Sequence, residues 1–147
     1  MYYIIQIFIY TSNMTGKKIL VLCAHPDDET LGLGGTLNIH TSNGDIISVI
    51  IFADGESSRN KSSKEITQRR RQAEKACKIL GIQNIKFLNY KDQMLDTIPT
   101  LELAKKIEKE IEITTPEIIY THFWGDVNQD HRKIFEATLV ATRPVPY

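Results

Sequence analysis

The chain has 147 residues, a length typical of one domain and sufficient to bury a hydrophobic core. Eighteen basic residues balance eighteen acidic ones, so the zero net charge argues against a protein that binds nucleic acid, which needs an excess of Lys and Arg. The two cysteines, Cys23 and Cys77, form neither a Cys-x-x-Cys pair nor a disulfide framework. This cysteine usage favours a reducing, cytoplasmic compartment.

The first ten residues, MYYIIQIFIY, are strongly apolar. The run is shorter than the roughly 20 residues of a bilayer span, and it lacks the basic start and cleavage site of a secretory signal. Residues 1–13 are therefore an edge strand, a membrane-surface anchor or a non-native extension, and Met14 before TGKKILVL favours the last. We expect no stable membrane span and one domain over residues 14–147.

Four apolar runs without polar alternation follow, at residues 19–23, 46–52, 85–88 and 118–120. Such runs are typical of buried parallel strands. Between and after them, helices are predicted at 31–42, 64–80, 99–113 and 130–141, with Gly81 and Pro99 as boundary signals. The alternation predicts an α/β fold: a Rossmann-like, doubly wound, mostly parallel sheet with strand order 3-2-1-4, flanked by helices. The chain stops at ATRPVPY, directly after the last helix, so we expect the domain to be truncated at its C-terminus or to need a partner.

An ionisable cluster, AHPDDE (residues 24–29), comes directly after the first predicted strand. Pro and the carboxylates suit the first turn of a helix and its dipole. That explanation leaves out His25, an imidazole at the tip of a buried strand. Ligands of open α/β sheets bind at the carboxyl ends of strands, so the position favours a functional site.

A second polar cluster, THFWGDVNQDHR (residues 121–132), follows the fourth predicted strand. With strand order 3-2-1-4, the fourth strand lies beside the first, and the two clusters face each other. An imidazole and a carboxylate from one loop, with an imidazole from the other, make a three-ligand metal site. Three protein ligands and one open position for water are typical of catalytic zinc. Asp27 and Asp28 can divide the tasks of ligand and general base.

The AHPDDE motif followed by Asp130-His131-Arg132 resembles the PIG-L/LmbE-like family of zinc-dependent de-N-acetylases, over about residues 17–144. The resemblance implies hydrolysis of the acetyl amide of an N-acetylglucosamine-type sugar conjugate, a small-molecule partner. It implies Zn as cofactor, with Fe or another divalent metal as the alternative. The site residues that it implies are the metal ligands His25, Asp28 and His131, the general base Asp27 acting on metal-bound water, and the substrate contacts Asp54, Arg71 and Asp92.

One position departs from the family pattern, which often has His-x-x-His where this chain has Asn128-x-x-His131. An amide can donate a hydrogen bond to an oxyanion, but it cannot deliver a proton at neutral pH. His122, or Asp27 returning the proton it accepts, could supply the acid. Non-catalytic alternatives stay open: a metal-retaining binding module or a truncated subunit, besides a metal hydrolase for another amide. Self-association is left open too.

Two further features have alternative interpretations. In the basic run 69–71, a solvated helix face is the default, although one arginine can point into the cleft. Trp124 is either a stacking platform for a sugar or a loop anchor. The glycines of residues 32–35 do not complete a dinucleotide motif, because Leu37 stands where its last glycine belongs.

Overall fold

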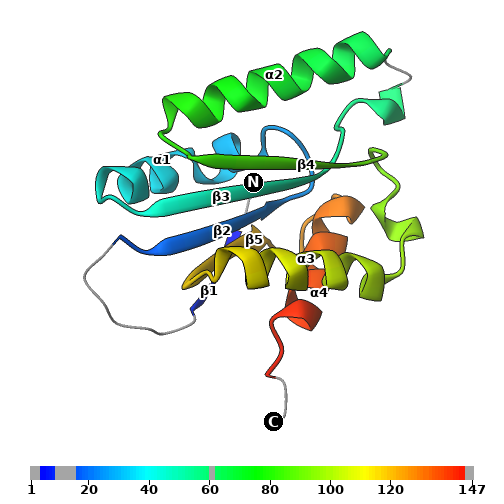
Figure 1. Cartoon of the computed structure of the whole chain (residues 1–147). Helices are drawn as coiled ribbons and strands as arrows, with labels where there is room; N and C mark the ends of the chain where they lie inside the picture. The colour runs from blue at the N-terminus through cyan, green and yellow to red at the C-terminus, as the bar shows by residue number, and fades with distance from the viewer. Residues whose placement is uncertain (1–3, 9–15, 60–61, 145–147) are drawn as a thin grey trace.

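The computed structural model describes residues 4–8, 16–59 and 62–144 (Figure 1). Its strands are β1 (Ile4–Phe8), β2 (Lys18–Cys23), β3 (Ile46–Ala53), β4 (Asn84–Tyr90) and β5 (Ile118–His122). Its α-helices are α1 (Asp28–Ser42), α2 (Ser63–Ile79), α3 (Thr100–Thr114) and α4 (Gln129–Ala141). Two short 3-10 helices, η1 (Ser57–Arg59) and η2 (Leu95–Thr97), follow β3 and β4. No helix of these described ranges is long and apolar enough to cross a membrane.

The strands form a single sheet in the order β1-β5-β2-β3-β4. β2 pairs in parallel with both β3 and β5, and β3 pairs in parallel with β4. These four are the strands expected from the sequence, so the predicted order 3-2-1-4 is confirmed. A continuous apolar run places apolar side chains on both faces of a strand. Such a strand is stable only where helices cover both faces of the sheet, which is why these runs form its parallel strands.

The apolar N-terminal run contributes β1, which pairs antiparallel with β5 at the edge of the sheet, Ile4 opposite His122. This is the edge-strand arrangement among the three alternatives considered for residues 1–13. The rest of that run, residues 1–3 and 9–13, lies outside the described part, and its status as a non-native extension stays a prediction.

Two hydrophobic layers cover the sheet. On one face, Leu33 and Leu37 of α1 pack with Ala73 and Cys77 of α2 against the sheet. On the other face, α3 and α4 pack against the sheet through Leu103, Ile107, Ile134 and Ala137. Figure 1 shows these helices on either side of the sheet; β2, β3 and β5 are buried between them, whereas β4 at the edge is only partly buried.

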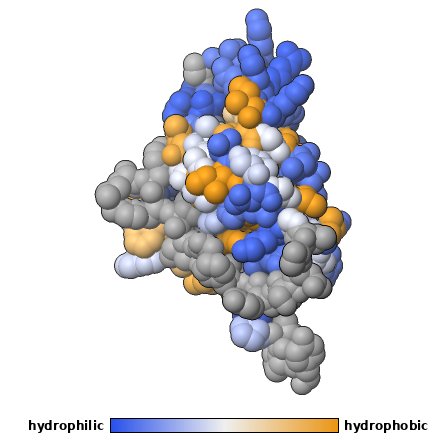
Figure 2. All heavy atoms as spheres, turned by 90° about the vertical axis from the view of Figure 1, so that its left-hand side faces the viewer, coloured by the Kyte–Doolittle hydropathy of each residue, from blue (hydrophilic) through white to orange (hydrophobic). Residues whose placement is uncertain are grey.

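The two ends of the sheet differ in character. The parallel strands all end at one edge, where the loops after β2, β3, β4 and β5 meet. At the opposite edge, seen in Figure 2, hydrophobic residues are scattered among hydrophilic ones. A hollow of about 460 Å³ lies there, but its charged residues are Lys18 and the ion pair of Lys86 with Glu110. The convergent ionisable side chains lie at the carboxyl edge instead.

Candidate metal centre

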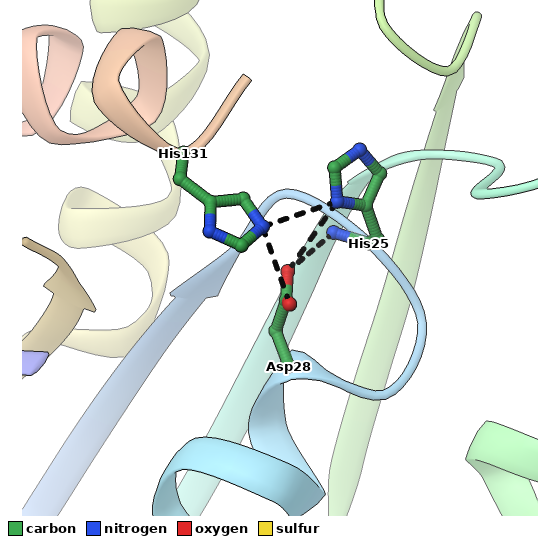
Figure 3. A group of neighbouring side chains, drawn as sticks. All are labelled: His25, Asp28 and His131. Atoms are coloured by element: carbon green, nitrogen blue, oxygen red, sulfur yellow. Dashed lines mark hydrogen bonds and ion pairs between the residues drawn. The ribbon is translucent and has the colours of Figure 1, made fainter. Parts of the chain in front are cut away.

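Three ligand-type side chains meet at the carboxyl edge of the sheet (Figure 3). His25 follows β2, Asp28 begins α1, and His131 lies in the first turn of α4. Nε2 of His131 lies 3.3 Å from Nδ1 of His25 and 3.3 Å from Oδ1 of Asp28. Nδ1 of His25 lies 3.7 Å from Oδ2 of Asp28. All three residues are buried, so their orientation is set by the surrounding packing.

The tight turn after β2 explains how the first two of these residues meet. The backbone N–H of His25 donates to Oδ2 of Asp28 at 2.8 Å, which closes the turn. Asp27 between them takes a φ of 141°, and its carbonyl accepts the first backbone bonds of α1. Gly55 from the next loop lies against this turn with a φ of 72°, where an added Cβ would lie 2.9 Å from Cδ of Pro26. A side chain at position 55 would therefore displace the turn.

The three ligand atoms fit a tetrahedral cation. With metal–ligand bonds of about 2.0–2.1 Å, the ligands of a tetrahedral zinc ion lie about 3.3 Å apart. The separations of 3.3 Å from Nε2 of His131 to Nδ1 of His25 and to Oδ1 of Asp28 match this value, and the other oxygen of Asp28, Oδ2, lies 3.7 Å from Nδ1 of His25. Two nitrogens and one carboxylate oxygen are also a donor set that zinc or iron accepts. The site could hold such an ion with little rearrangement.

Carboxylates behind the two imidazoles set their tautomers. Nε2 of His25 lies 3.0 Å from Oδ2 of Asp130 and 3.0 Å from Oδ1 of Asp92. Nδ1 of His131 lies 3.0 Å from Oδ2 of Asp126. A proton on each of these outer nitrogens leaves the lone pairs of Nδ1 of His25 and Nε2 of His131 directed at one point. Metal-binding histidines usually have this arrangement.

A second group, His25 with Asp92 and Asp130, has ligand-type atoms within 4.8 Å of one another. The oxygens of Asp130 already accept the backbone N–H groups of Gln93 at 2.8 Å and Leu95 at 3.0 Å. Asp92 accepts the hydroxyl of Ser58. Because these oxygens are engaged, the two carboxylates serve better as partners of His25 than as metal ligands.

The pKa values of Asp28, His25 and Asp92 are shifted by the hydrogen bonds and charges that these residues share. Burial by itself raises the pKa of Asp28, but the hydrogen bond with His131 and the nearby imidazoles outweigh it and hold the pKa below its usual range. Burial by itself lowers the pKa of His25, but its hydrogen bonds with Asp130 and Asp92 raise it to about 10. In reverse, the pKa of Asp92 falls to about 2 against the effect of burial, because His25 and Ser58 hydrogen-bond to it. Without a metal, a proton on His25 balances these acids, and a cation can replace it.

Asp27 occupies a different environment from Asp28. Its side chain is 37% exposed and, with the metal-ligand group, lines a hollow of about 170 Å³. Burial raises the pKa of Asp27 above its usual value, although the ion pair with Arg69 at 2.5 Å opposes this. A carboxylate with a raised pKa beside a polar hollow is a stronger base than an ordinary aspartate, which suits it to accept a proton from water.

The two residues considered for oxyanion and acid roles differ in placement. Asn128 lines the hollow and caps α4, its Oδ1 accepting the N–H of Asp130 at 2.9 Å, which leaves Nδ2 as its donor. His122 ends β5, stacks on His131 and accepts the N–H of Ala24 at Nε2, 2.8 Å away. Burial lowers the pKa of His122 to about 4, so it is neutral at pH 7. His122 does not line the hollow, and the geometry gives it a packing role.

A scan against family models matches residues 20–142 to PIG-L, described as GlcNAc-PI de-N-acetylase. The chain belongs to this family. An uncharacterized deacetylase, YaiS of Escherichia coli K12, is 33% identical over 88% of this chain and 70% of its own length. A probable N-acetyl-alpha-D-glucosaminyl L-malate deacetylase 2 of Bacillus anthracis is 25% identical over 88% of the chain and 61% of its own length. Among solved structures, N,N'-diacetylchitobiose deacetylase from Pyrococcus horikoshii superimposes with a TM-score of 0.72 at 24% identity, covering 85% of this chain and 49% of that one.

Of the substrate contacts expected for a PIG-L family member, the structure brings only Asp92 into the hollow. Asp54 instead accepts the N–H groups of Glu56 and Ser57 and so holds the loop before η1. Arg71 is exposed and lines a separate surface hollow with the start of α2. Arg69, two residues earlier on the helix, points at Asp27 in its place. Trp124 is 63% exposed and tilts against Phe123, which leaves both of its interpretations open.

Three residues that contact the candidate ligands or Asp27 were given no individual role from the sequence: Arg69, Asp126 and Asp130. Arg69 belongs to the basic run 69–71, but the sequence does not say which arginine of that run faces Asp27. That depends on how α2 is rotated about its axis relative to the sheet. Asp130 directly precedes His131 at the start of a helix. A carboxylate at that position is explained equally well by its favourable interaction with the helix dipole as by a role beside the metal ligands. Its burial, which is complete, is the signal that separates these interpretations.

Proposed function

We propose that this chain carries the catalytic centre of a metal-dependent de-N-acetylase that hydrolyses the acetyl amide of an N-acetylated amino sugar. The observation that carries the proposal is the convergence of His25, Asp28 and His131 beside Asp27 in one polar hollow. Membership of the PIG-L family supports the reaction class, and relatives named as deacetylases of N-acetylglucosaminyl compounds support the sugar. The chain spans 61–70% of the first two of these relatives, so the substrate of the whole protein is part of the proposal.

We assign the metal to His25, Asp28 and His131. When bound there, a divalent cation would supply a Lewis acid for the amide carbonyl and would lower the pKa of water to about 7. Zinc is the favoured ion because of the ligand spacing, with iron as the alternative.

The remaining chemistry belongs to side chains of the hollow. Asp27 accepts a proton from the attacking water, a role favoured by its raised pKa and its partial exposure. The Nδ2 group of Asn128 donates to the oxyanion as the carbonyl carbon becomes tetrahedral. The C–N bond then breaks as Asp27 returns its proton to the amine nitrogen, releasing acetate and the amino sugar. This assignment needs no acid from His122, whose Nε2 is already an acceptor.

The deciding experiment compares three variants for metal content and for acetate release from N-acetylglucosamine conjugates. His25→Ala and Asp28→Ala should lose stoichiometric metal together with activity. Asp27→Asn should keep the metal and lose about 100-fold or more in turnover, as expected for a general base. Metal retained in both ligand variants would refute the ligand assignment.

Lys75→Gln provides the matched control for a charge change on α2, because Lys75 is exposed and is not among the residues that line the polar hollow. It should leave metal content and turnover within about twofold of the parent. A folded, metal-loaded parent protein that releases no acetate from any conjugate would favour a binding module over an enzyme.

A further inference from the structure

Gln93 has a backbone conformation that residues with side chains rarely adopt. It lies in the loop after β4 with a φ of 59°, in the left-handed region where glycine is the usual residue. Its backbone N–H donates to Oδ2 of Asp130 at 2.8 Å, and its carbonyl accepts Nε2 of Gln129 at 3.0 Å. Both bonds involve only the backbone of Gln93, so a glycine would form them with less strain. The turn therefore does not account for the glutamine side chain.

The side chain of Gln93 lines the polar hollow beside the three candidate metal ligands. Its Nε2 lies 3.5 Å from Oδ1 of Asn128, a long distance for a hydrogen bond. Oδ1 of Asn128 already accepts the N–H of Asp130 at 2.9 Å, so Asn128 is oriented without help from Gln93. The contact is thus weak enough for Nε2 of Gln93 to exchange it for a better acceptor in the hollow.

The orientation of the Gln93 carboxamide follows from this contact. Because Oδ1 of Asn128 accepts the N–H of Asp130, only the NH2 group of Gln93 can face it favourably. One N–H of Gln93 points at Asn128, and the other can donate to a bound molecule. Two neutral carboxamides thus line the same hollow, Asn128 from the start of α4 and Gln93 from the loop after β4.

The charged groups of the hollow are poorly suited to stabilise a developing negative charge. Asp27, Asp28 and Asp92 would repel it. Arg69 is already paired with Asp27, and Arg59 is exposed on η1, where solvent screens its charge. Carboxamide N–H groups carry no net charge that attracts these acids, and preorganised neutral donors are typical of oxyanion holes.

We propose that Nε2 of Gln93 is a second donor to the oxyanion that forms when water attacks the amide carbonyl. The inference rests on the proposed function and deepens it, because it adds a catalytic residue beside Nδ2 of Asn128. The left-handed backbone at position 93 holds the side chain at the hollow while its N–H and carbonyl stay bonded to α4. Strained backbone at a non-glycine residue is often found where a side chain must be placed for function.

The test measures acetate release from N-acetylglucosamine conjugates by the metal-loaded full chain. Gln93→Gly keeps both backbone bonds, relieves the strain and removes the side-chain donor. It should lower kcat about 10- to 100-fold and leave KM within about threefold, because the donor acts only in the transition state. Gln93→Glu has the same size without the donor and should lose at least as much, since a carboxylate repels the oxyanion.

Asn89→Gly is the matched control. Asn89 is another carboxamide residue with a positive φ, 66°, but it is exposed near the end of β4 and is not among the residues that line the polar hollow. Both glycine variants should melt close to or above the parental temperature, and Asn89→Gly should keep the parental kcat. The proposal is overturned if kcat of Gln93→Gly stays within about twofold of the parent, or if its kcat falls together with its metal content.

Binding of a tetrahedral analogue gives a readout that needs no hydrolysis. The methylphosphonamide of glucosamine carries an oxygen where the oxyanion would form, whereas N-acetylglucosamine carries the planar amide. In calorimetry, Gln93→Gly should bind the analogue about tenfold more weakly than the parent and bind N-acetylglucosamine equally well. If the parent releases no acetate, the proposed function fails; equal affinities of parent and variant for the analogue would overturn the role of Gln93.

Discussion

The substitution Asp130→Asn tests how a buried carboxylate prepares His25 to bind a metal. Asp130 is fully buried and accepts three hydrogen bonds, from Gln93, Leu95 and Nε2 of His25. An asparagine has the same shape but offers one oxygen, so its amide nitrogen must face at least one of these donors. Where it faces His25, the imidazole moves its proton to Nδ1, the nitrogen directed at the metal position.

The expected magnitudes follow from these contacts. One donor–donor contact in the interior costs about 1–3 kcal/mol of unfolding free energy. For a chain of this length, that lowers the melting temperature by roughly 2–12 °C. Loss of a carboxylate behind a metal-binding histidine reduces metal affinity about 10- to 100-fold.

Two measurements separate the effects on folding and on metal binding. Urea unfolding of the metal-free protein gives the stability change, and competition with a chromophoric chelator gives zinc affinity. Asp45→Asn is the matched control, because Asp45 is also buried and accepts from His40 at 2.6 Å and from the N–H of Lys17 at 2.7 Å. It should lose stability and keep zinc affinity. If Asp130→Asn binds zinc within about twofold of the parent while its stability falls as in the control, the positioning role of Asp130 is refuted.

Four further predictions concern two glycines, a histidine and a thiol. Gly55→Ala should lower the unfolding free energy by about 1–3 kcal/mol, from the positive φ and the contact with Pro26, in urea titrations. Gly35→Ala, in α1 with no atom within 4 Å of an added Cβ, should raise it by about 0.5–1 kcal/mol. Zinc affinity should rise with pH from about 6.5 to about 8.5, by up to about tenfold per unit, because the pKa of His25 is raised to about 10 in the metal-free protein and zinc must displace its proton. Burial raises the pKa of Cys77 to about 12, so a disulfide reagent should modify it only upon unfolding.

Each of these has a clear contrary result. Equal stability effects of the two glycine substitutions would show that the positive φ and the close approach at position 55 carry no cost. A zinc affinity independent of pH over the stated range would mean that His25 is already neutral there. Fast modification of Cys77 in the folded protein, at the rate of a free thiol, would contradict its burial.

The sequence by itself determined the fold class and, through its motifs, the family. Continuous apolar runs predict buried parallel strands, and the order 3-2-1-4 brings the loops of the first and fourth together. That adjacency predicted that His25 and Asp28 meet an imidazole of the second cluster, and the resemblance to the family selected His131, more than a hundred positions away. The resemblance to the family, rather than the residue pattern, assigned the base role to Asp27 and the ligand role to Asp28.

Only the tertiary structure decided which neighbours complete the site. Arg69 rather than Arg71 faces Asp27, because the phase of a helix relative to a sheet depends on side-chain packing along its whole length. Nε2 of His122 accepts the N–H of Ala24, which directly follows β2, and no local pattern encodes this contact between segments far apart in the chain. Asp130 became a partner of His25 because the loop after β4 supplies its other two donors. Periodicity and motifs act along the chain, whereas hydrogen-bond partners and burial depend on elements that meet only after folding.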